Sequence, residues 1–192
     1  AWSLRWAGFR VVVIDRGTGV TPSKIAAGLV TPITGKTLVR TWRYHDLWPR
    51  ARDYYARVQR ETGGSFFHEL GMVRLFDSDD EPALFERRRA TGDFAGLLNP
   101  HPLRIDEHSF ACERSGFEMT GAARLDIPRY LELSQDSFRR DGALVETDLD
   151  VSREIEVVPE GVHLPRLGIT AGRMIFCQGF ETTENPWFRD VE

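Results

Sequence analysis

Cysteine, long hydrophobic runs and surplus positive charge are all scarce in this sequence of 192 residues. The two cysteines, Cys112 and Cys177, lie far apart and form no C-x-x-C pair, which suits a reducing compartment, so we expect a cytoplasmic protein. No apolar run approaches the ~20 residues that span a bilayer, and we expect no membrane span. The net charge of −4 gives no general case for nucleic-acid binding, and we expect none.

Sequence motifs for metal and hydrolytic chemistry are missing as well. The histidines are far apart, and the sequence contains neither H-E-x-x-H nor G-x-S-x-G. We therefore expect no metal site and no nucleophilic hydrolase. Gly35-Lys36-Thr37 is not a phosphate-binding P-loop, because the preceding Gly28 lies too far upstream for the G-x-x-x-x-G-K spacing.

The most informative segment that is present runs from Val11 to Asp15. Four consecutive apolar β-formers, Val11–Ile14, predict a strand buried on both faces, as in a parallel sheet. Asp15 ends it where a dinucleotide-binding βαβ unit holds an adenosine ribose, although a turn-forming aspartate is the alternative. Residues 1–8 have the pattern of a helix end. We therefore expect the first strand of the unit and its G-x-G-x-x-G turn upstream of Ala1.

A segment of small residues, Thr21–Leu29, follows this strand. Small side chains let backbone amides approach a ligand closely, and Gly28 removes the last steric limit. The Ser23 hydroxyl could donate a hydrogen bond to a phosphate oxygen. The alternative is a tightly packed turn against a neighbouring element.

Periodicity and end signals predict helices and strands along the remaining chain. A helix is expected over residues 40–61, a second after the Ser78-x-x-Glu81 capping box, and a third from Asp126, its N-cap, to Gly142. Extended segments are expected over Phe66–Phe76, Phe110–Phe117, Ala143–Glu146, Val151–Val158, Val162–Leu164 and Met174–Cys177, the last of them fully buried. The order indicates one nucleotide-binding sheet interrupted by a second layer of structure.

Taken together, these segments resemble the FAD-dependent oxidoreductases of the D-amino-acid oxidase and glycine oxidase family. The matching segments follow the order of the family: Val13–Arg16, Ser23–Leu29, Gly121–Leu131 and Ile175–Gly179, with Val151 nine residues after Gly142. The resemblance covers nearly the whole chain. It implies an α/β fold, in which a truncated Rossmann-like FAD-binding sheet over residues 1–40 and 125–192 holds an inserted α+β portion of the substrate domain over residues 41–124.

The resemblance also implies which residues bind the FAD cofactor. They are Asp15, Arg16, Pro22, Ser23, Ala27, Gly28, Leu29, Val151, Gln178 and Gly179. Asp15 would hold the adenosine ribose with Arg16 beside it, and Pro22 and Ser23 would lie near the pyrophosphate. The backbone of residues 27–29 would line the flavin side, and Val151 would contact adenine through its main chain. Gln178 and Gly179 would lie close to the cofactor.

The implied activity is oxidation of the C–N bond of an amine or amino acid by hydride transfer to FAD. The enzyme would use oxygen or a quinone as electron acceptor. We assign no catalytic residue, and we expect this chain alone to be inactive and to bind FAD poorly. Two alternatives remain: a flavoprotein acting on a modified tRNA base, which the acidic balance disfavours, and an α/β binding domain that holds no cofactor.

Overall fold

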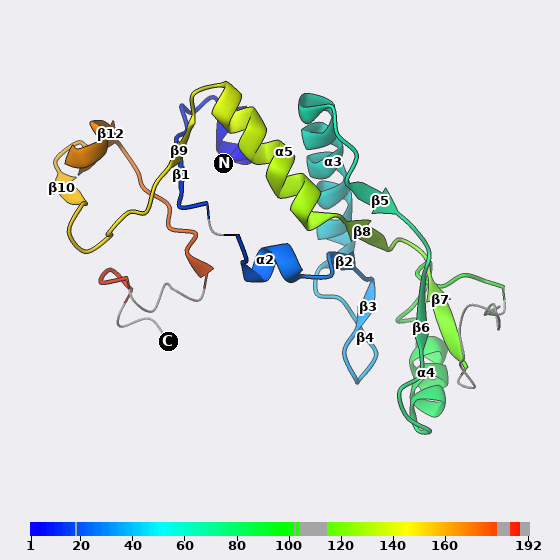
Figure 1. Cartoon of the computed structure of the whole chain (residues 1–192). Coiled ribbons are helices and arrows are strands. Elements are labelled where there is room, and N and C mark those ends of the chain that lie inside the picture. Colours follow the sequence, from blue (N-terminus) through cyan, green and yellow to red (C-terminus); the bar gives the residue numbers. More distant parts are fainter. Residues whose placement is uncertain (18, 102, 104–114, 180–184, 189–192) are drawn as a thin grey trace.

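The structure is a computed structural model that describes residues 1–17, 19–101, 103, 115–179 and 185–188. Its elements spread out along one direction, with the sheet that contains β10 and β12 at one end and α4 with β6 and β7 at the other (Figure 1). The accessible surface of 13386 Å² exceeds the about 9300 Å² expected of a compact protein of 21.9 kDa. A substantial part of the chain therefore does not fold back onto the rest.

A parallel pair of strands joins the N-terminal segment to the later part of the chain. β1 (Val13–Asp15) pairs with β9 (Leu144–Glu146), with Asp15 opposite Glu146. The predicted strand over Val11–Ile14 is thus shifted by about one residue. Its predicted burial on both faces is wrong, since the strand is only half-buried and Val12 is 49% exposed. Among the described residues β1 has β9 as its single partner, which leaves the other edge of the strand uncovered.

Helix α5 (Ile127–Arg140) connects this pair to the middle of the chain. The predicted N-cap is confirmed, because the Asp126 carboxylate accepts a hydrogen bond of 3.1 Å from the Arg129 amide. The buried Phe138 contacts Trp2 of α1 (Trp2–Trp6), with ring centroids 5.0 Å apart. The Trp2 indole donates a hydrogen bond of 3.0 Å to the Ser134 hydroxyl. These contacts hold α1 against α5 within the first hydrophobic core, whose buried members are Trp2, Val58, Phe66, Leu125 and Phe138.

Helix α3 (Tyr44–Thr62) begins four residues later than the expected residue 40 and ends at Gly63, which has a φ of 71°. A three-stranded antiparallel sheet lies beside it, in the order β2 (Leu29–Val30), β8 (Ala123–Leu125) and β5 (Phe67–Glu69). This sheet takes strands from both sides of the boundary expected near residue 40, so the predicted division into domains stays a prediction.

A second core lies under two antiparallel strand pairs and a helix. The pairs join β3 (Ile33–Thr34) to β4 (Val39–Arg40), and β6 (Met72–Leu75) to β7 (Gly116–Met119). Helix α4 (Glu81–Ala90) packs Phe85 on Phe117, with ring centroids 4.4 Å apart. The expectation of one or two strands over Phe66–Phe76 is confirmed as two, β5 and β6.

The predicted capping box at Ser78 and Glu81 is wrong. The N-cap of α4 is Asp80, and it makes no side-chain capping bond. The buried Glu81 carboxylate instead accepts hydrogen bonds of 2.8 Å from the Asp77 amide and from the Arg74 guanidinium. Pairing with Arg74 offsets the cost of burying the carboxylate, so this residue serves the core rather than the helix end.

The last part of the chain departs most from the predicted strands. Residues 151–154 form a turn, and only β10 (Glu156–Val158) of the predicted strand is present. It pairs with β11 (Gly161–Leu164), which leads through the short helix η1 (Pro165–Leu167) to β12 (Ile169–Ala171).

Met174–Cys177 is not a strand, and Ile175 is 64% exposed. A parallel strand is buried only between hydrogen-bonded neighbours, and no described residue pairs with this segment. Of the extended segment expected at Phe110–Phe117, residues 110–114 lie outside the described part of the chain, as does Cys112. None of the described helices is long and apolar enough to cross a membrane.

Candidate functional site

The carboxyl ends of β1 and β9 meet at one edge, as parallel strands require. The Asp15 carbonyl accepts a hydrogen bond of 3.0 Å from the amide of Thr147, the first residue after β9. The segment that leads to Val151 therefore starts beside Asp15.

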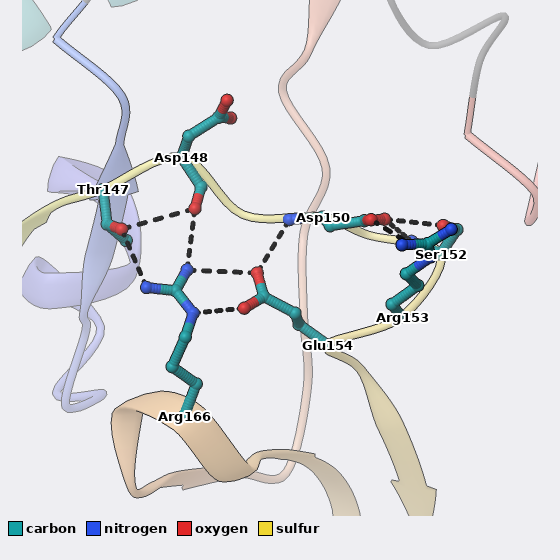
Figure 2. A network of polar contacts seen from close by, with 7 residues as sticks. All are labelled: Thr147, Asp148, Asp150, Ser152, Arg153, Glu154 and Arg166. Carbon is teal, nitrogen blue, oxygen red and sulfur yellow. Dashed lines mark hydrogen bonds and ion pairs between the residues drawn. The ribbon is translucent and has the colours of Figure 1, made fainter.

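A polar network holds the turn that contains Val151 (Figure 2). The Arg166 guanidinium donates hydrogen bonds to the Thr147 hydroxyl (3.1 Å) and the Asp148 carbonyl (2.7 Å), and it forms an ion pair with the Glu154 carboxylate through two of its nitrogens. The Arg166 hydrogen bond holds the pKa of Glu154 below its ordinary value, and the same pair raises the pKa of Arg166. Both groups are therefore charged at neutral pH.

The predicted phosphate-side residues lie on a single helical turn. Helix α2 (Pro22–Ile25) is capped by Thr21, whose hydroxyl accepts a hydrogen bond of 3.4 Å from the Lys24 amide. It lies between β1 and β2 in the fold (Figure 1). Pro22 and Ser23 are both exposed, so the Ser23 hydroxyl is accessible to a ligand.

Gly28 is explained by packing. Its φ is 69°, and a Cβ atom there would lie 1.9 Å from the Leu125 carbonyl oxygen on β8. The Gly28 carbonyl also accepts a hydrogen bond of 2.8 Å from the Leu125 amide. This is the alternative that the sequence left open, a tight turn against a neighbouring element. Ala27 and Leu29 on either side are exposed, which keeps that face of the segment open to a ligand.

The late segment with Gln178 and Gly179 is held by a side-chain hydrogen bond and contains a bend. The Gln178 side-chain oxygen accepts a hydrogen bond of 2.7 Å from the side-chain nitrogen of Asn185, a residue that is fully buried. Gly179 has a φ of 63°, which fits the predicted bend. The expected position of Gln178 and Gly179 close to the cofactor stays a prediction.

Sequence reasoning missed a cavity of about 340 Å³ beside β2. Three aromatic residues, Trp42, Tyr44 and Trp48, line it together with Leu29 and Leu47. The Tyr44 and Trp48 rings are stacked with centroids 5.9 Å apart, and the Tyr44 hydroxyl donates a hydrogen bond to the Gly121 carbonyl. The signal was present in the helical spacing of residues 44, 47, 48 and 51, which puts these side chains on one face of α3.

Comparison with protein families decides the classification. A family model described as FAD-dependent oxidoreductase, DAO, matches residues 1–189. The chain belongs to this family. Its cofactor is therefore FAD, and the family implies a Rossmann-like α/β fold for FAD binding, as the resemblance predicted. No curated protein and no solved structure matched the chain.

The chemistry at Asp15 fits the adenosine part of FAD. One carboxylate oxygen accepts a hydrogen bond of 2.7 Å from the Gly17 amide, and the other lies 3.4 Å from the Gln135 side-chain nitrogen. A carboxylate has about four acceptor positions, so two remain for the ribose hydroxyls of FAD. The turn-forming role of Asp15 is therefore real and is compatible with ribose binding.

Metal ligands do not gather in the part of this DAO-family chain that the structure describes. No group of three or more His, Cys, Asp or Glu residues there is placed to hold a metal ion. The free thiol of Cys177 is exposed and stands outside any such group.

Proposed function

We propose that this chain is part of an enzyme that oxidises the C–N bond of an amine or amino acid. The observation that carries the proposal is the position of Leu29. This residue belongs to the segment expected to line the flavin, and its side chain also lines the aromatic cavity. A substrate in the cavity would therefore lie next to the flavin, with its apolar part among the aromatic rings.

The cavity lining favours a reaction that needs no acid or base from the protein. None of the ten described residues that line it carries a carboxylate or an imidazole. Tyr44 is its one acidic group, and burial raises the pKa of this phenol above its ordinary value. FAD, when bound, accepts the hydride from the carbon beside nitrogen. The residues of this chain then have two tasks, to orient the substrate and to exclude water.

The proposal also covers the electron acceptor, which the family resemblance implies, and the location, which the cysteine content suggests. Oxygen or a quinone would reoxidise the flavin, and the free thiol of Cys177 favours a reducing, cytoplasmic location. Action on a modified tRNA base is less favoured, because the net charge of −4 offers no surplus of positive charge to a nucleic acid.

The proposal is tested by anaerobic reduction of the purified full-length flavoprotein. Amines and amino acids with apolar side chains are mixed with it, and loss of the visible flavin absorbance is followed together with ammonia release. We expect Trp42→Ala to raise the substrate concentration for half-maximal reduction, because the exposed indole lines the cavity. Val157→Ala, at another strongly exposed apolar position, on β10, is the control. Reduction by hydroxy acids and by no amine would exclude C–N oxidation.

A further inference from the structure

The turn over residues 147–154 bridges the site edge and the sheet that contains β10. The turn begins at Thr147, whose amide donates a hydrogen bond to the Asp15 carbonyl, and it ends just before β10. Within it, the amides of Arg153 and Glu154 donate hydrogen bonds of 3.2 and 2.9 Å to the Asp150 carbonyl. The turn thus has a defined backbone, although no strand pairing supports it among the described residues.

Arg166 ties the two ends of this turn together from outside. It lies on η1, beyond β11, and its guanidinium contacts Thr147 and Asp148 at the start of the turn and Glu154 at its end (Figure 2). The guanidinium is planar and presents several donors in a fixed arrangement, so one side chain can satisfy a hydroxyl, a carbonyl and a carboxylate together. A lysine in its place would supply the charge without that geometry.

The network continues to both neighbours of Val151. The second oxygen of Glu154 accepts a hydrogen bond of 2.8 Å from the Asp150 amide. The Asp150 carboxylate accepts hydrogen bonds of 2.9 and 2.6 Å from the amide and hydroxyl of Ser152, and these bonds hold the pKa of Asp150 below its ordinary value. The residues on each side of Val151 are therefore fixed by contacts that lead back to Arg166.

Val151 itself keeps its backbone polar groups available. Within the described part of the chain, neither its amide nor its carbonyl makes a hydrogen bond, although the residue is half-buried. Backbone polar groups in partly buried positions are normally paired with protein, water or a ligand. A donor and an acceptor from one residue, held by a turn that begins beside Asp15, match the adjacent acceptor and donor of an adenine ring edge.

We propose that Arg166 is a positioning residue for the adenosine half of FAD. It holds the 147–154 turn so that the Val151 main chain is already in place when the cofactor arrives, which reduces the entropy lost on binding. The inference rests on the proposed placement of Val151 in the cofactor site. Arg166 acts through Glu154 and the turn, and its own side chain does not need to touch FAD.

The test measures FAD affinity of the full-length apoprotein by fluorescence titration, for the wild type and for Arg166→Met, Arg166→Lys and Arg129→Met. Arg129 is the matched control, because its side chain is as exposed as that of Arg166, 48% against 45%, and it pairs with Glu132 on α5 and not with the turn. We expect Arg166→Met to weaken FAD binding about fivefold, Arg166→Lys to weaken it less, and Arg129→Met to leave it unchanged.

Hydrogen–deuterium exchange of the apoprotein provides a readout that does not depend on FAD. Amides of residues 147–154 should exchange faster in Arg166→Met than in the wild type, with no change in the β1–β9 pair. Unchanged exchange of residues 147–154 would show that Arg166 does not hold the turn. Faster exchange with unchanged FAD affinity overturns the link to the cofactor. The Asp15→Asn variant distinguishes this result from a wrongly placed cofactor site. If Asp15→Asn weakens FAD binding and Arg166→Met does not, FAD still binds beside Asp15, and only the role of Arg166 is overturned. If neither variant weakens FAD binding, the cofactor lies elsewhere.

Discussion

Replacing Gly28 with alanine separates packing from cofactor contact as the reason for a glycine at this position. The residue has a φ of 69°, and a Cβ atom would lie 1.9 Å from the Leu125 carbonyl oxygen. An L-residue in this left-handed region loses about 1–2 kcal/mol. The collision also forces β2 away from β8 and weakens the 2.8 Å hydrogen bond from Leu125 to Gly28, which costs about 1 kcal/mol. The expected loss is therefore about 2–3 kcal/mol.

The same substitution at Gly142 is the matched control. Its φ is 65°, but no atom lies within 4 Å of the position that a Cβ would take. Only the backbone strain applies there, and we expect a loss of about 1–2 kcal/mol. The difference between the two variants, about 1 kcal/mol, isolates the contribution of the close approach to β8.

Urea unfolding of the apoprotein, followed by circular dichroism, measures both losses without any cofactor. The reasoning is refuted if Gly28→Ala and Gly142→Ala destabilise the apoprotein equally. If both variants lost the same unfolding free energy and only Gly28→Ala bound FAD more weakly, Gly28 would be required for cofactor contact and not for packing against β8.

Three further outcomes are expected. Asp15→Asn should weaken FAD binding about tenfold, because it removes the charged acceptor for the ribose hydroxyls, while the new amide oxygen still accepts the hydrogen bond from Gly17. Unchanged FAD affinity would show that the Asp15 carboxylate does not bind the cofactor. Trp2→Ala should cost about 3–5 kcal/mol in urea unfolding, because the indole is 2% exposed and packs on Phe138; a loss below ~1 kcal/mol contradicts that packing. The pKa of Glu154 is lowered in the folded state, so its contribution to the stability of the turn is present above its ordinary pKa of 4.5 and is lost as pH falls through the lower folded value. FAD affinity should then stay level from neutral pH to about 5 and decline as pH falls through that lower value, and Glu154→Gln should make the decline smaller in a fluorescence titration.

Elements with local end signals were predictable from the sequence. The helix from Asp126 follows from an N-cap carboxylate and a proline in the first turn, which act within a few residues and need no tertiary partner. The parallel pairing of β1 with β9 placed Asp15 and the segment leading to Val151 at one edge, as expected for a nucleotide-binding unit.

Elements that depend on distant partners were not predictable in the same way. Met174–Cys177 is as apolar as a buried strand, but strand formation requires a hydrogen-bonded neighbour that composition does not specify. The predicted strand from Val151 was too long because Asp150 and Ser152 form a local side-chain turn that competes with extended backbone. The role of Arg166 could not be inferred, since its contacts join residues separated by 12 to 19 positions.

The distribution of apolar residues connects fold and function. Neither hydrophobic core includes a described residue of the 16–29 segment: one core lies in the packing of α1, α3 and α5, and the other lies under the β6–β7 pair. The expected cofactor segment instead leaves Val20, Ile25 and Leu29 between 57% and 76% exposed. Exposed apolar surface of this kind is unfavourable in water unless something covers it. Because a ligand that binds only the folded state stabilises it, FAD at 100 times its dissociation constant should add about 2.7 kcal/mol to the free energy of unfolding. This added stability should be concentrated in β1, α2 and β2, where FAD should slow hydrogen exchange. The two hydrophobic cores are buried without the cofactor, so their exchange should change little.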